Sequence, residues 1–158
     1  MPGRNAALAE GSGWEAGITV EGWEPAIYLA EPDGTTAETT PSFDVIVFGN
    51  KGKVLVRIPR ELLGEGDPTT WAYAAAVMSQ EGFPSPGVRR IRDIQQNAQQ
   101  WRGGGAPVDI NHTRIFDVAW ANAGEQEELL SSYEPITAGS VDDLRAEDFG
   151  VIPLVAAG

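Results

Sequence analysis

Acid–base side chains are plentiful in this sequence, but their spacing does not define a catalytic centre. The chain has 158 residues, 23 of them Asp or Glu. With so many acids, some carboxylate pair will reach the separation of a glycosidase pair by chance. The one histidine, His112, is the only imidazole available to the serines, and none of these has the local spacing of a nucleophile elbow. We therefore predict no catalytic residue and a protein that is not an enzyme.

The sequence also offers few residues that could bind a metal ion or a cofactor. The chain has no cysteine, which excludes a disulfide framework, a thiolate metal site and a cysteine nucleophile. Asp109-Ile-Asn-His112 offers oxygen and imidazole ligands, but the same residues suit a turn in which Asp or Asn bonds its own backbone, and we favour the turn. Neither Gly11-Ser-Gly13 nor Gly103-Gly-Gly105 continues as a phosphate-binding loop. We expect no metal and no cofactor.

Tryptophan is the residue type that points to a ligand. The chain has five, and the flat face of an indole packs well against the C–H face of a pyranose ring. Trp14 and Trp71 lie on the apolar faces of predicted strands, so we expect them in the core. Trp23 lies at a turn, and Trp101 precedes three glycines. These two are our candidates for an exposed platform, although a loop tryptophan also commonly covers the core.

Four arginines lie near the second of these tryptophans in the sequence: Arg89, Arg90, Arg92 and Arg102. Either they pair with surrounding acids, or they donate hydrogen bonds to ligand hydroxyls or to an acidic polymer. On the second interpretation, the ligand-binding residues are Trp101, Arg102, Trp23 and Arg90.

The net charge of −12 narrows the range of partners. Nucleic-acid binders depend on basic side chains that neutralise phosphates, and an anionic membrane surface makes the same demand. The longest uncharged apolar run, from Trp71 to Met78, is far shorter than the ~20 residues of a membrane span. The residues after Met1 do not form the apolar region of a signal peptide. We expect neither nucleic-acid binding nor membrane insertion.

The elements that must position these side chains are short strands. Period-2 alternation over 14–20 predicts a strand with one buried face, and similar runs follow at 25–30, 43–48, 53–58, 71–78 and 151–155. A four-residue turn at 49–52 joins two of them. Residues 31–41 read as a loop with a Pro-Asp-Gly turn, residues 95–101 as a short helix, and 103–105 as a flexible break. Gly124–Tyr133, with acids in its first turn, is the best helix candidate. The pattern predicts an all-β, antiparallel β-sandwich with one short helix in the C-terminal half.

An ordered series of short motifs resembles a known family, the C-terminal domain of glucodextranase, which is also found at the ends of secreted amylopullulanases and related family-57 glycoside hydrolases. The motifs are Pro2-Gly-Arg-Asn-Ala, Trp14-Glu-Ala-Gly-Ile-Thr-Val-Glu-Gly-Trp23, Val56-Arg-Ile-Pro59, Trp71-Ala-Tyr73, Val88-Arg-Arg-Ile-Arg92, Trp101-Arg-Gly-Gly-Gly105, and Phe116-Asp-Val118 with Glu125-Gln-Glu-Glu-Leu-Leu130.

The resemblance implies a DOMON-like, carbohydrate-binding-module-like sandwich without catalytic activity. The expected partner is a polysaccharide, either an α-glucan or a cell-wall glycan, and the expected location is extracellular or at the cell surface. A protein–protein module that docks on the parent enzyme or on a surface layer is the alternative.

Domains of that family open with strands ahead of the Pro-Gly-Arg-Asn element. We therefore expect residues 1–158 to be a single module, the later part of a longer domain. Incomplete coverage of its sheets would then produce a large exposed apolar patch, a homodimer that pairs edge to edge, or contacts with the parent enzyme.

Overall fold

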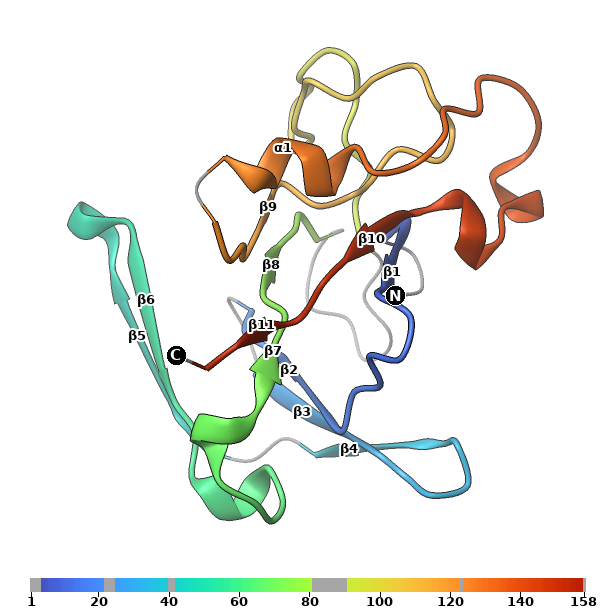
Figure 1. Cartoon of the computed structure of the whole chain (residues 1–158). Coiled ribbons are helices and arrows are strands. Elements are labelled where there is room, and N and C mark those ends of the chain that lie inside the picture. The colour runs from blue at the N-terminus through green and yellow to red at the C-terminus, as the bar shows by residue number, and fades with distance from the viewer. Residues whose placement is uncertain (1–3, 22–24, 40–41, 81–90, 123, 158) are drawn as a thin grey trace. The chain divides into compact units, whose positions relative to one another are not determined.

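The computed structural model describes residues 4–21, 25–39, 42–80, 91–122 and 124–157. Their strands pair into five small sheets, accompanied by one short α-helix (Figure 1). The all-β prediction, with one helix in the C-terminal half, is confirmed. The sandwich arrangement and the single module over 1–158 stay predictions. Contacts divide the chain into two compact units, the terminal unit (Met1–Ser12 with Pro68–Gly158) and the inserted unit (Gly13–Asp67).

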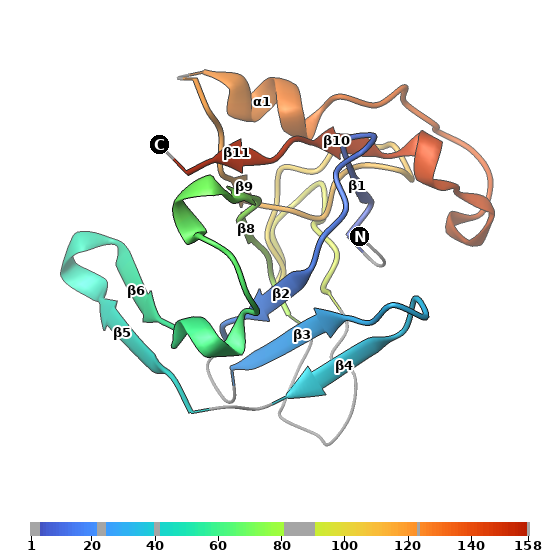
Figure 2. The same cartoon turned by 60° about the horizontal axis from the view of Figure 1, so that its bottom comes forward.

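The inserted unit consists of two antiparallel sheets. One has the strand order β2-β3-β4, whose strands lie side by side in Figure 2, and the other is the β5–β6 hairpin. The predicted alternation produces these strands, and the predicted turn at residues 49–52 is confirmed, with Gly52 in the left-handed region at φ 57°. The strands are β2 (Ala16–Thr19), β3 (Ala26–Ala30), β4 (Thr36–Thr39), β5 (Asp44–Phe48) and β6 (Lys53–Arg57).

The terminal unit is built from both ends of the chain. Its β1 and β10 pair in parallel, and Figure 1 shows them side by side. Two antiparallel pairs complete its sheets, β7 with β11 and β8 with β9. The elements are β1 (Ala6–Leu8), β7 (Ala72–Tyr73), β8 (Ala76–Val77), β9 (Asp117–Val118), α1 (Glu125–Leu130), β10 (Gly150–Ile152) and β11 (Val155–Ala156). Antiparallel pairing thus holds in every sheet of the described residues except β1–β10.

The core of the terminal unit is small and apolar. Ala6, Ile115, Val118 and Ile152 are buried together. Leu129 and Leu130 of α1 pack against them, with Ala76 and Met78. Burying each large aliphatic side chain contributes roughly 1.5–3 kcal/mol. The helix therefore covers the core with its leucines while its first turn presents acids to solvent.

Several sequence expectations are wrong in detail. Residues 36–39 form β4 instead of continuing a loop, because threonine suits a strand despite its polarity. The expected strand over 71–78 is two short strands, since its alanines offer little surface to fix one pairing. The expected final strand divides into β10 and β11 around Pro153, which lacks the N–H that a ladder needs. Trp14 is 44% exposed instead of buried, and its ring lies beside Gly17. Trp71 is partly buried.

Candidate ligand-binding site

Trp101 lies at the tip of a hairpin-like loop over residues 95–106, here called the Trp101 hairpin. The amide of Gln99 donates to the carbonyl of Arg102 at 3.1 Å, and Arg102 donates back to Gln99 at 3.0 Å. Further down, Gln95 and Gly103 are joined at 2.8 Å, and Ala106 donates to Gln95 at 3.0 Å. The expected helix over 95–101 is therefore wrong: these residues bond across to 102–106.

The tip presents the indole to solvent on a constrained backbone. Trp101 is 76% exposed and has a φ of 69°, the left-handed region that bulky residues rarely adopt. Such a conformation costs on the order of 1–3 kcal/mol and persists only where its surroundings enforce it. Here the two mutual Gln99–Arg102 bonds close the turn, and the Arg92 guanidinium donates to the Trp101 carbonyl. The turn therefore holds the indole ring in an exposed position.

The three glycines behind the tip are packed, so the expected flexible break is wrong. A Cβ at Gly103 would lie 2.4 Å from the Phe116 ring, and one at Gly104 would lie 2.5 Å from the Ala98 backbone nitrogen. Gly105 has a φ of 99° and donates to the Gln96 carbonyl at 3.1 Å. Glycine is needed here for close approach and for a left-handed backbone.

A cleft of about 530 Å³ lies along the return side of this hairpin. Phe116 and Tyr133 supply aromatic surface, and Gln126 and Glu127 of α1 supply polar groups. Burial raises the pKa of Tyr133 above its usual 10.0, assisted by the charge of Asp109 and a hydrogen bond to its carboxylate. Other lining residues are Ile94, Gly104, Gly105, Ala106, Pro107, His112, Thr113, Ile115, Leu130 and Ser131. Aromatic walls with a few polar groups are typical of a small-ligand site.

A polar network fixes the base of the Trp101 hairpin. The His112 ring contacts Asp93 Oδ1 through Nε2 at 3.0 Å and the Asp109 carbonyl through Nδ1 at 2.5 Å. Arg114 Nε lies 3.3 Å from the same Asp93 oxygen, an ion pair without hydrogen-bond alignment. Asp93 is next to Arg92, which holds the Trp101 carbonyl. This network therefore links the displayed ring to the segment 109–114.

Two asparagines anchor that segment in turn. Asn111 is fully buried, and its amide donates to the carbonyls of Glu134 and Asp148 while its oxygen accepts from Ile136. Asn5 donates to the His112 carbonyl at 3.0 Å. The expected turn at Asp109–His112 is present, with the His112 amide bonded to the Asp109 carbonyl at 3.4 Å. The Asn111 side chain, however, bonds distant backbone and not the backbone of its own turn. Asn111 and His112 therefore have structural roles in this segment.

The structure describes two of the four residues of the sequence-predicted ligand site. Trp101 and Arg102 are adjacent and exposed, and in the described part of the chain no carboxylate lies within ion-pair distance of Arg102. Trp23 and Arg90 lie outside the described residues. Sequence reasoning missed the cleft, because its lining comes from four separated stretches of the chain, at residue 94 and within 104–107, 112–116 and 126–133. The ordered motifs Trp101–Gly105, Phe116–Val118 and Glu125–Leu130, which contribute to it, were the available signal.

Features of other functional classes were sought in the same residues. Both ring nitrogens of His112 are occupied by Asp93 and the Asp109 carbonyl, so this imidazole does not face a serine. Among the described residues, no cluster of three His, Asp or Glu side chains is arranged to hold a metal ion. The same residues contain no helix whose length and apolar character suit a membrane crossing.

Comparison with known protein families identifies a match. The family model described as the C-terminal, SLH-like binding module of glucodextranase matches residues 1–141. No curated protein and no solved structure matches the chain. The strands β10 and β11 follow the matched residues, yet β10 pairs with β1 and is part of the same compact unit.

Proposed function

Because the chain belongs to the family of C-terminal, SLH-like binding modules of glucodextranase, we propose that it is a non-catalytic module that binds carbohydrate through Trp101. Exposure of this indole on a left-handed backbone is the observation that carries the proposal. A buried structural tryptophan has no need of such a turn. A ring held above its own hairpin can stack on the face of a pyranose.

The chemistry around the ring supports the same function. Arg102 follows Trp101 directly and is free to donate hydrogen bonds to ligand hydroxyls. The cleft beside the Trp101 hairpin adds Phe116, Tyr133, Gln126 and Glu127, a combination of aromatic surface and hydrogen-bonding groups. The ligand that we propose is a polysaccharide, an α-glucan or a cell-wall glycan. Trp23 and Arg90 remain proposed contributors.

The family also supports the proposed setting. A binding module of glucodextranase is expected to accompany a polysaccharide-degrading enzyme, outside the cell or at its surface. In that position it would hold the enzyme on its polymer, so that the catalytic part meets substrate at a raised local concentration. Contacts with the parent enzyme are part of this proposal.

The test is titration of the full chain with dextran, soluble starch and purified cell-wall polysaccharide in a calorimeter. Trp101→Ala should weaken binding roughly 10- to 100-fold, by analogy with the ~1–3 kcal/mol that a stacked ring contributes on flat ligands. Trp120→Ala, which removes another exposed tryptophan of the terminal unit, is the matched control and should bind normally. Absence of binding to all three polymers by the folded wild-type chain would overturn the proposal.

A further inference from the structure

The β5–β6 hairpin carries apolar side chains on both of its faces. Cross-strand register places Val45, Val47, Val54 and Val56 on one face, here called the valine face. Its outer pair is the more exposed, with Val47 67% and Val54 55% accessible. The opposite face carries Ile46, Leu55 and Phe48 together with the charged Asp44, Lys53 and Arg57. A two-stranded ribbon alone is marginally stable in water, and exposed apolar faces of this kind mark interaction surfaces.

Positive charge accompanies this apolar surface. The hairpin with its turn, residues 44–57, contains Lys51, Lys53 and Arg57 against the single acid Asp44, a charge of +2 in a chain of −12, so the other residues carry −14. The arginines near Trp101 were the basic residues singled out from the sequence, so this concentration was missed. Both lysines of the chain lie here.

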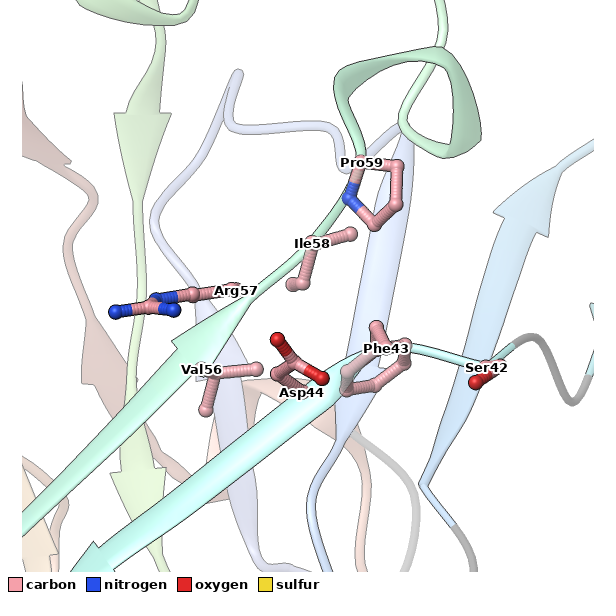
Figure 3. Close-up of a pocket in the computed structure, with 7 residues that line it drawn as sticks. All are labelled: Ser42, Phe43, Asp44, Val56, Arg57, Ile58 and Pro59. Carbon is pink, nitrogen blue, oxygen red and sulfur yellow. The ribbon is translucent and has the colours of Figure 1, made fainter.

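The cationic side chains of the hairpin are exposed to solvent and can pair with acids of another molecule. Within the described residues, Lys51, Lys53 and Arg57 form no ion pair. Figure 3 shows the hollow of about 570 Å³ at the base of the hairpin, where the Arg57 guanidinium extends away from the Asp44 carboxylate although the two residues are cross-strand partners. Arg60 donates to the Gly66 carbonyl.

We infer that the β5–β6 hairpin is a docking surface for the acidic surface of a second copy of this chain. Charge complementarity decides the occupant: the hairpin carries +2 in a chain whose remainder carries −14. A dimer in which two hairpins pair edge to edge would oppose +2 with +2, and like charges at contact are disfavoured. Reciprocal docking, each hairpin on the acidic surface of the other copy, closes as a symmetric dimer. The valine face supplies apolar contact, while Lys51 in the turn and Lys53 and Arg57 on the opposite face attract the acidic surface through their field.

Sedimentation velocity over a range of concentrations tests the dimer. The wild-type chain should dimerise, and Lys53→Glu should weaken the dimer about tenfold or more, because it lowers the net charge of the hairpin from +2 to 0. The control Arg145→Glu makes the same charge change at an exposed site of the terminal unit and should leave dimerisation unchanged. A monomer at every concentration, or a dimer insensitive to Lys53→Glu, would overturn the inference.

The valine face is tested with V47T/V54T, which keeps side-chain shape and strand propensity but makes the surface polar. This variant should weaken the dimer about tenfold or more, as expected when buried valine surface is lost. The matched control V77T/V108T alters two similarly exposed valines of the terminal unit and should dimerise normally. Equal weakening by both variants would contradict a role for the valine face. If V47T/V54T is unfolded by circular dichroism, the Lys53 comparison decides.

The two lysines also allow the contact to be mapped. A carbodiimide joins amines directly to carboxylates, and Lys51 and Lys53 carry the only side-chain amines. In a mixture of isotope-labelled and unlabelled chains, we expect mixed-isotope cross-links from these lysines to Asp or Glu outside residues 44–57. K51R/K53R should keep the dimer and lose these cross-links. Cross-links formed only within single chains would mean that the hairpin is covered by its own chain, and would overturn the inference.

Discussion

The terminal unit and the inserted unit differ in how much they bury. In the terminal unit, Ile94, Ile115, Val118 and Ile152 are buried, as are the polar side chains of Asn5, Asp109, Asn111 and Thr113. In the described residues of the inserted unit, only Ala26 and Ile27 fall in this class. The inserted unit has the longer strands but the smaller core, and its order comes from strand pairing and turns.

This difference separates two kinds of recognition surface. The terminal unit holds Trp101 on a base fixed by Asp93, His112 and Arg114, so that one ring is presented in a defined position. Pre-organisation of this kind lowers the entropy cost of binding a small repeating ligand. The inserted unit presents a broad aliphatic ribbon with cations, which suits a protein surface more than a sugar ring. Four variants test this difference between the two units.

The largest effect should come from Asn111→Ala in the terminal unit. This change orphans two carbonyls and one amide that Asn111 now satisfies, and each buried unsatisfied group costs roughly 1–3 kcal/mol. We expect a loss of about 3 kcal/mol or more in the free energy of unfolding, measured by urea titration. Asn97→Ala, at an exposed position of the same unit, should be close to neutral. An unchanged urea midpoint for Asn111→Ala would remove the polar network as a source of stability.

Ile27→Ala should be the most damaging single change in the inserted unit. Ile27 is its one large, fully buried side chain in the described residues, and Ile→Ala in a core costs about 2–5 kcal/mol. Hydrogen exchange read by mass spectrometry should show lost protection over 13–67 and retained protection over 91–157. Equal loss of protection in both ranges would show that the two units unfold together.

Trp101→Gly should stabilise the terminal unit while abolishing carbohydrate binding. Glycine adopts the φ of 69° without strain, and the gain should be about 0.5–1 kcal/mol after its greater freedom in the unfolded chain is deducted. Thermal unfolding and calorimetric titration measure the two effects on the same sample. A lower melting temperature would mean that the indole contributes packing, and would weaken its assignment as a displayed ring.

The smallest effect concerns the turn between β3 and β4. Thr35 donates to Asp33 Oδ1 through its amide at 2.9 Å and its hydroxyl at 2.6 Å, which lowers the pKa of Asp33 below the usual 3.8. A carboxyl whose pKa is lowered by folding stabilises the fold above the unfolded pKa, and this contribution is lost as pH falls through the folded pKa. An NMR titration should give a pKa under 3.8, and Asp33→Asn should abolish the acid-dependent exchange of the Thr35 amide. A pKa at or above 3.8 would contradict the bonded turn.

Strands could be predicted from the sequence where alternation marks a face. The runs around Ile18, Ile27, Ile46 and Leu55 became β2, β3, β5 and β6, and the helix at 125–130 followed from its acids and leucines. The Pro-Asp-Gly turn was also predictable, because Asp33 and Gly34 have the chemistry that such a turn needs. Local sequence patterns therefore predicted the elements whose structure is determined by neighbouring side chains.

The remaining features depend on contacts between distant residues. Nothing around Ala6 marks it as a strand, since its partner is Gly150. Gln95–Trp101 reads as a helix because glutamine favours one, whereas bonds to 102–106 override that preference. The glycines that follow Trp101 made it a candidate site residue, but its left-handed backbone conformation could not be predicted from the sequence. The cleft at Phe116 and Tyr133 likewise requires four stretches of the chain to meet.

The parallel pairing of β1 with β10 sets an order for biosynthesis. Ala6 leaves the ribosome long before its partner Gly150 exists, and at about 5–20 residues per second the interval is roughly 7–30 seconds. The inserted unit is contiguous in sequence, so both of its sheets can pair during that interval. Strand β1, by contrast, stays without its partner until β10 has been made. The unit that displays the indole therefore closes later than the inserted unit can.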